Sequence, residues 1–81
     1  MRVTVRLFAQ LRDAAGRGVW EADVTPGAVV RDVWRDATAR HPGIAPFEKA
    51  ISCAVNASFA PMTQPVADGD DIAFLPPVSG G

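Results

Sequence analysis

The sequence has few of the residues from which enzymes build catalytic sites. Among its 81 residues it contains one histidine, one cysteine and no tyrosine. His41 precedes Pro42 at the end of an expected helix, where a capping or dipole role explains it. Cys53 lies in an apolar run with no acid–base partner nearby in sequence, which favours a buried and inert thiol. Autonomous catalysis is therefore poorly supported.

The sequence also lacks a motif for binding a metal ion or a phosphate group. A single cysteine excludes an internal disulfide and a multi-cysteine metal site, and the sequence contains no phosphate-binding glycine loop. The acidic run Asp68-Gly69-Asp70-Asp71 departs from the spacing of a calcium loop, and a tight turn between strands explains it better. We therefore expect no metal and no tightly bound cofactor.

Charge and hydropathy exclude two further classes of partner. The formal net charge is −1, from 8 basic and 9 acidic residues, and leaves no electrostatic footprint for nucleic acid. No apolar stretch is long enough to span a membrane, and the alternating start Met1–Arg6 is unlike the apolar block of a signal peptide. We expect a cytoplasmic protein with no nucleic-acid or membrane partner.

The remaining composition is that of one small globular domain, with 48% hydrophobic and 21% charged residues. Alternation of apolar and polar residues predicts strands over 3–7, 19–24, 51–55 and 71–75, and a short stretch around 59–62. A short helical turn is expected over 9–15, and a loop over 44–50.

One segment has a clear helical period. A single apolar face recurs every three or four residues at Val30, Val33, Trp34, Ala37 and His41. Asp36 and Arg40 form an opposite-charge i,i+4 pair, and Pro42-Gly43 ends the helix. Val29 is a poor N-cap, so we expect the first turn to fray.

The order β-β-α-β-β-β leaves one helix to cover one face of a small mixed sheet, because its apolar stripe has no other element to pack against. A hairpin, a crossing helix and a closing strand beside the first make the β-grasp arrangement of ubiquitin, an α+β fold. We expect the β-grasp domain over 1–75 and an extended diglycine tail over 76–81.

Strand parity indicates a second surface. If Val3, Val5 and Leu7 face the helix, Phe8 faces away, and by the same parity Leu75 faces away from the helix-facing Phe74. Phe8 and Leu75 would then lie together on the uncovered face, where Phe59 is a third candidate. Such a cluster is either a partner-binding surface or the ordinary packing of strand ends.

The C-terminal residues are the most distinctive feature. Two prolines favour an extended backbone, and residues 76–81 can reach roughly 20 Å beyond the last strand at full extension. Gly80 and Gly81 lack a Cβ, so backbone and carboxylate can pass where other residues would clash. The shape suits a carboxyl terminus that enters another protein's active site, although a loose chain end is the plainer alternative.

The terminal carboxylate is then the one reactive group. It is ionised and a poor electrophile at neutral pH. Joined to AMP it becomes a mixed anhydride, from which a sulfur nucleophile can displace the AMP to leave a thiocarboxylate. Each step requires an active site on another protein, so the tail must fit at least two partners.

Several stretches resemble the small, sulfur-carrying subunit of molybdopterin synthase, a ubiquitin-like family. They span nearly the whole chain and comprise Phe8–Arg12, Ala39–Pro42, Ala54–Asn56, Asp68–Asp70 and Phe74–Gly81, whose Pro-Pro-Val-Ser-Gly-Gly ending is the most discriminating part. Two positions depart from the family: Val29 replaces a frequent threonine cap, and Ala57 replaces a glycine or polar turn residue.

The resemblance implies that Gly81 is adenylated by a ubiquitin-activating-like enzyme and then thiocarboxylated with sulfur from a donor protein, Gly80 being its slender neighbour. The tail would enter the large synthase subunit, which holds the active-site cavity, and give sulfur to precursor Z to form the dithiolene of molybdopterin. It also implies a hetero-tetramer and a partner surface formed by Phe8, Phe59, Leu75, Pro76, Pro77, Val78 and Ser79.

Two alternatives remain open from the sequence. A related carrier serving thiazole or cysteine synthesis also ends in diglycine, although its lead-in resembles this one less. A protein of a different class, either a β-grasp interaction module or a modifier conjugated to lysines, has the same elements.

Overall fold

The computed structural model describes residues 1–77, and the predictions for Val78, Ser79, Gly80 and Gly81 therefore lie outside the described residues. The elements, in chain order, are β1 (Arg2–Leu7), α1 (Ala9–Ala15), β2 (Val19–Asp23), α2 (Val30–Arg40), the 3-10 helix η1 (Pro42–Phe47), β3 (Ser52–Val55), β4 (Ser58–Ala60) and β5 (Asp71–Leu75). The predicted elements agree with these to within a residue or two, except for the 44–50 loop.

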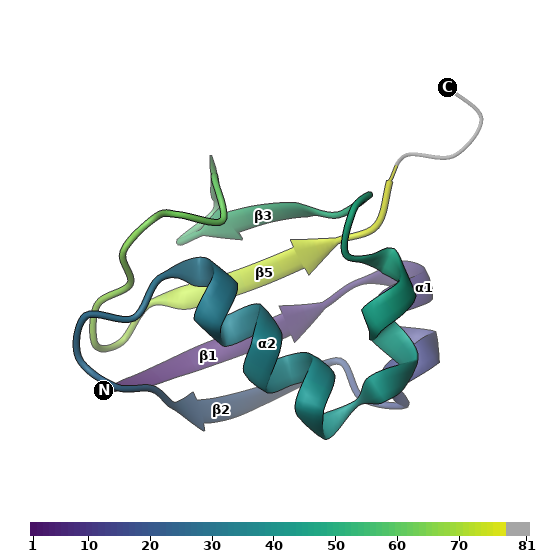
Figure 1. The fold of residues 1–81 in the computed structure, drawn as a ribbon, viewed down its shortest axis with the longest axis horizontal. Helices are drawn as coiled ribbons and strands as arrows, with labels where there is room; N and C mark the ends of the chain where they lie inside the picture. Colours follow the sequence, from purple (N-terminus) through teal and green to yellow (C-terminus); the bar gives the residue numbers. More distant parts are fainter. Residues whose placement is uncertain (78–81) are drawn as a thin grey trace.

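The strands form one mixed sheet in the order β2-β1-β5-β3-β4. The central pair β1 and β5 is parallel, and the other neighbours are antiparallel. Figure 1 shows α2 crossing one face of this sheet, while the chain that follows β5 leaves at the end of the sheet near α1. The closing strand thus lies beside the first, and the predicted ubiquitin-like β-grasp fold is confirmed.

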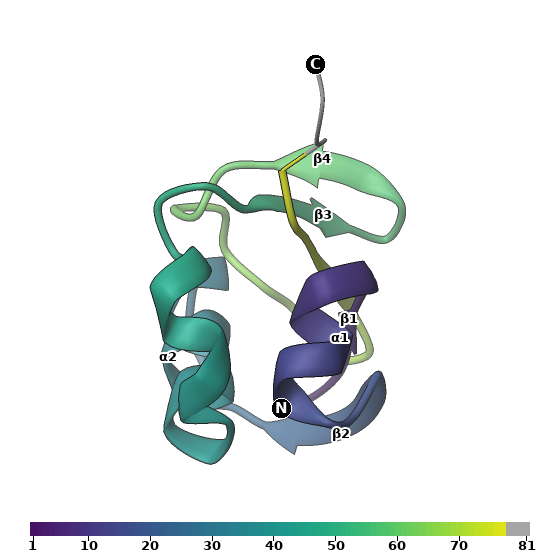
Figure 2. The same cartoon turned by 90° about the vertical axis from the view of Figure 1, so that its right-hand side faces the viewer.

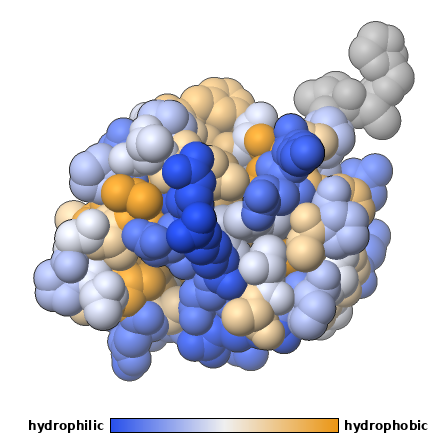
Figure 3. All heavy atoms as spheres, in the orientation of Figure 1, coloured by the Kyte–Doolittle hydropathy of each residue, from blue (hydrophilic) through white to orange (hydrophobic). Residues whose placement is uncertain are grey.

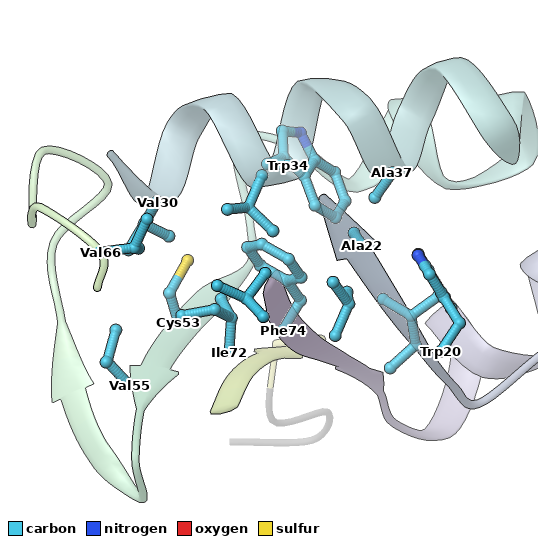
Figure 4. Packing of buried hydrophobic residues seen from close by; sticks show 14 of the residues in the cluster. Trp20, Ala22, Val30, Trp34, Ala37, Cys53, Val55, Val66, Ile72 and Phe74 are labelled. Carbon is cyan, nitrogen blue, oxygen red and sulfur yellow. The ribbon is translucent and has the colours of Figure 1, made fainter. Parts of the chain in front are cut away.

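The core fills the space between α2 and the sheet. Alternate residues of β1 and β5 and the apolar stripe of α2 are almost fully buried, among them Val3, Val5, Leu7, Val30, Val33, Trp34, Ile72 and Phe74. Phe74 packs edge-on against Trp34, with ring centroids 5.0 Å apart (Figure 4). Trp34 Nε1 donates a hydrogen bond to Glu48 Oε1 at 3.1 Å, so this buried indole keeps a polar partner.

The start of α2 corrects one prediction. The backbone N–H of Val29 donates to Asp32 Oδ2 at 2.9 Å. The N–H groups of Val30 and Arg31 donate to the carbonyls of Gln64 and Met62, at 2.9 and 2.8 Å. Because the connection between β4 and β5 supplies these acceptors, the first turn is held without a capping side chain at Val29, and the expected fraying is contradicted.

The segment after α2 corrects a second prediction. Residues 42–47 form η1 instead of the predicted loop, with Pro42 in its first turn. Proline lacks an N–H and has a fixed φ, both of which suit the start of a helix. Ile44 is fully buried, and its burial holds η1 against the rest of the domain. The end of α2 itself is as predicted, with His41 as its C-cap and an Asp36–Arg40 ion pair of 2.9 Å.

The turn between β3 and β4 has unusual backbone. Asn56 and Ala57 have φ angles of 51° and 69°, and Val55 pairs directly with Ser58. Two residues with positive φ make a tight hairpin loop whose twist matches that of the strands. Asn56 tolerates this region, whereas Ala57 does so at a cost. Pro61 follows β4 and, having no N–H, ends its pairing.

The helix-bearing side of the molecule is largely hydrophilic, with small scattered hydrophobic areas (Figure 3). Such scattered apolar residues are ordinary for a protein surface. The opposite face of the sheet, which no helix covers, is therefore where a partner surface is to be sought.

Candidate functional site: the open face of the sheet and the base of the tail

Phe8 and Leu75 continue two neighbouring parallel strands. Leu7 pairs with Phe74, and both are buried beneath α2. The next residue on each strand points to the other face, which puts Phe8 and Leu75 on the uncovered side. Phe8 is 44% exposed and also caps α1, because its carbonyl accepts the N–H of Leu11 at 3.1 Å.

Phe59 lies on the same face. The strand register defines a single row across all five strands, made of Val19, Arg6, Ala73, Ala54 and Phe59. Phe59 is 82% exposed and lies two strands, or about 10 Å, from the Ala73 position. The structure thus places all three predicted aromatic and aliphatic residues on one face. Their role in binding a partner stays a prediction.

The open face is hollowed on both sides of Phe8. One hollow of about 270 Å³ is lined by Arg6, Phe8, Asn56, Ala57, Asp71 and Ala73. The other, of about 210 Å³, is lined by Arg6, Leu7, Phe8, Arg12, Gly18 and Val19. Phe8 therefore stands as a ridge between two depressions. A third hollow, of about 450 Å³, lies beside Phe59 where Pro61 turns the chain away from β3.

Sequence reasoning missed what shapes these hollows. Ala73 is a small residue at an open-face position and lines the hollow beside Phe8. Val19 is 49% exposed and extends the apolar surface on β2. Parity could have identified Val19, because it alternates with the buried Trp20, but no sequence signal gives the depth of a hollow.

Polar side chains brace the centre of the open face. Arg6 Nε donates to both carboxylate oxygens of Asp71, at 2.7 and 3.0 Å. Asn56 Oδ1 accepts the backbone N–H of Asp71, and its Nδ2 donates to Asp70 Oδ1, each at 2.9 Å. The exposed Arg6–Asp71 ion pair contributes about 0–1 kcal/mol to stability. Its main consequence is that Arg6 is directed toward β5 and its charge is neutralised.

A second ion-paired group lies at the far end of β1. Arg2 Nε donates to Asp23 Oδ1 at 3.2 Å, and this hydrogen bond with the nearby guanidinium charge lowers the pKa of Asp23. Arg2 also contacts Glu21 at 3.3 Å. These pairs neutralise the charged ends of β1 and β2 away from Phe8.

The base of the tail lies beside this face. β5 ends at Leu75, Pro76 is half-buried and Pro77 is exposed. Because β1 and β5 are parallel, α1 and the chain that leaves β5 lie at the same end of the sheet, as Figures 1 and 2 show. The boundary predicted at residues 75 and 76 stays a prediction.

The groups considered as catalytic in the sequence have structural roles. Cys53 is buried, and desolvation raises the pKa of its thiol from the ordinary 9.0 to about 11. Its Sγ lies 3.6 Å from Met62 Sδ. The rings of His41 and Trp20 pack in a T-shaped pair, with centroids 4.9 Å apart. Cys53 is thus a protonated core residue at neutral pH, as predicted.

The acidic run is a turn. Asp70 Oδ2 accepts the backbone N–H of Ala67, Asp68 Oδ1 accepts that of Arg2, both at 2.8 Å, and Gly69 has a φ of 86°. Within residues 1–77 no group of three or more histidine, cysteine or acidic side chains is arranged to hold a metal ion. In the same part of the chain, no helix has the length and hydropathy needed to cross a bilayer.

The fold and its exposed sheet face define a ubiquitin-like β-grasp protein, and comparison with known proteins narrows the class. The ThiS family profile matches residues 5–81, and the chain belongs to that family. It is 31% identical over the full length of both chains to the molybdopterin synthase sulfur carrier subunit of Chlamydomonas reinhardtii. To the protein of the same name from Escherichia coli it is 32% identical, over 98% of this chain and 99% of that one.

Solved structures agree with the fold. The structure of SAMP1 from Haloferax volcanii superposes with a TM-score of 0.90 at 29% identity and full coverage of both chains. A chain in the BexX/CysO complex of Amycolatopsis orientalis superposes with a TM-score of 0.77 at 31% identity, over 98% of this chain and 99% of that one. A chain of the complex of subunits 1 and 2 of molybdopterin-converting factor from Helicobacter pylori, at 24% identity and a TM-score of 0.72 with full coverage, shares the fold.

Proposed function

We propose that this protein is the sulfur carrier subunit of molybdopterin synthase. The carboxylate of Gly81 is adenylated, sulfur replaces the AMP, and the thiocarboxylate gives its sulfur to precursor Z on the large synthase subunit. The observation that carries the proposal is full-length similarity to proteins named as that subunit, with a family match that extends to residue 81.

The chemistry assigns a narrow role to this chain. The mixed anhydride forms when the Gly81 carboxylate displaces pyrophosphate from ATP, and it breaks when a hydrosulfide ion released by a donor protein attacks the carbonyl and displaces AMP, which leaves the thiocarboxylate. AMP and sulfur are thus transient groups on the carboxylate. Gly80 and Gly81 present no Cβ to the reacting atoms. The adenylating enzyme and the large subunit supply the catalytic groups.

The open face supplies the docking surface. Phe8, Phe59 and Leu75 offer apolar area around hollows that a complementary surface can fill. Pro76 and Pro77 stiffen the start of the tail, and Val78, Ser79 and the diglycine are the residues that we propose the partner's cavity receives. The assembly that we propose is a hetero-tetramer with two large subunits.

One other function has specific support. The close superposition on SAMP1 of Haloferax volcanii, and the 31% identity of this chain to small archaeal modifier protein 1 of that organism, favour a modifier conjugated to lysines as the second candidate. A modifier uses the same adenylated glycine but transfers it to an amine, so it would appear in cell lysate as isopeptide-linked adducts.

Intact mass spectrometry tests the proposal. The protein is co-expressed with its adenylating enzyme and a sulfur donor, and the mass of the isolated chain is compared with that of a Gly81 deletion variant treated identically. We expect one oxygen-to-sulfur exchange in the wild type and none in the deletion variant. An unchanged wild-type mass, although the purified adenylating enzyme forms the AMP adduct of the same protein, would rule the proposal out.

A further inference from the structure

Arg12 lies at the edge of the open face, with its stem against Gly18. Its backbone belongs to α1, which the fully buried Leu11 fixes to the core. Its aliphatic stem lies on Gly18 so closely that a Cβ at Gly18 would be 2.9 Å from Arg12 Cδ and 3.3 Å from Cγ. Arg12 is exposed and lines the 210 Å³ hollow beside Phe8, together with Gly18.

Charge in this hollow is unbalanced. It contains two arginines, and Arg6 is already neutralised by Asp71. Among residues 1–77 the Arg12 guanidinium has no ion-pair or hydrogen-bond partner, whereas Arg17 close by donates to the carbonyl of Val19 at 3.3 Å. An unpaired guanidinium with five donors, in a hollow that the exposed Phe8 also lines, suits a planar acceptor on an apolar surface.

We propose that Arg12 is the ion-pairing anchor of the docking face, and that it receives a carboxylate from an Asp or Glu on the large synthase subunit. The guanidinium fork matches a carboxylate in a two-bond geometry. The hollow is continuous with the apolar ridge of Phe8, so the partner must present the carboxylate next to apolar side chains. The inference rests on the proposed function, because it assigns this partner.

Binding to the purified large subunit tests the inference, with full-length wild type and three variants. Arg12→Gln removes the charge. Gly18→Ala keeps the charge but displaces the stem of Arg12. Arg17→Gln is the matched control, since it removes one exposed arginine charge nearby. Dissociation constants are measured by calorimetry at about 50 mM and about 500 mM salt, and thermal melting verifies that each variant folds.

We expect Arg12→Gln to raise the dissociation constant roughly tenfold at low salt, and Arg17→Gln to raise it less than about twofold. The dissociation constant of Gly18→Ala should fall between those of the two arginine variants. The gap between wild type and Arg12→Gln should narrow at high salt, because an ion pair is screened. If Arg12→Gln folds poorly, the dissociation constants of the wild type and of Gly18→Ala at the two salt concentrations provide the test.

Each outcome decides a different claim. If the wild type binds and the Arg12 and Arg17 variants bind equally well at both salt concentrations, the anchor is refuted and the proposed function stands. If the wild type itself does not bind the large subunit, the proposed function fails and the anchor with it.

Discussion

Replacing Ala57 by glycine should stabilise the domain. Ala57 occupies the second position of the two-residue loop between β3 and β4 with a φ of 69°. A residue with a Cβ pays about 1–2 kcal/mol in this region, whereas glycine pays mainly about 0.5–1 kcal/mol of additional chain entropy. The net expectation is a gain of about 0.5–1 kcal/mol in the free energy of unfolding.

The contacts around Ala57 indicate that the substitution changes mainly backbone strain. The side chain of Asn56 is tied to Asp70 and Asp71 by two hydrogen bonds, which favour the same turn in the glycine variant. Ala57 is exposed and removes no core contact when its methyl group is lost. The substitution therefore changes backbone strain and little else, and the resulting Asn-Gly pair is the favoured one for this loop.

Urea unfolding followed by circular dichroism measures the effect, with Ala54→Gly as the control. Ala54 lies within β3, where glycine is expected to destabilise by about 0.5–1 kcal/mol. The Ala57 variant should unfold at higher urea with an unchanged slope, and its melting temperature should rise by about 2–8 °C. Lower stability of the Ala57 variant would refute the strain argument.

Two further predictions concern the open face and the thiol. Phe59→Ala should change the free energy of unfolding by less than about 0.5 kcal/mol, because the ring is 82% exposed. The same substitution should weaken binding to the large subunit roughly tenfold or more, whereas the control Arg35→Ala, on the outer side of α2, should leave binding unchanged. Equal binding of the two variants would show that the ring lies outside the interface. Cys53 should alkylate slowly at neutral pH, because its thiol pKa is raised to about 11. Since the unfolded thiol ionises at lower pH than the folded one, its contribution to stability is fully present below pH 9.0 and is lost as pH rises toward about 11. Fast alkylation of the folded protein at pH 7 would contradict this burial.

The fold could be predicted because its elements follow from local patterns. Alternation in β1 and β5 and the helical period from Val30 to Ala37 each have a single buried face. Parity alone then placed Phe8 and Leu75 on the same side of the sheet, and the parallel register of β1 with β5 agrees.

What could not be predicted depends on residues distant in sequence. The start of α2 lacks a capping side chain at Val29, yet the carbonyls of Met62 and Gln64 hold it, and no local pattern reveals such a contact. The 3-10 helix η1 forms around the burial of Ile44. The position of Arg12 likewise depends on Gly18, which approaches it only because the hairpin folds back.

Single-turnover sulfur transfer tests the central claim most directly. Protein thiocarboxylated at Gly81 is mixed with the large subunit and precursor Z, and the carrier mass and the pterin product are followed together. The account predicts that each carrier returns to the carboxylate mass as molybdopterin appears, and that neither change occurs without the large subunit. Retention of sulfur on the carrier, with no molybdopterin formed in the complete mixture, would contradict it.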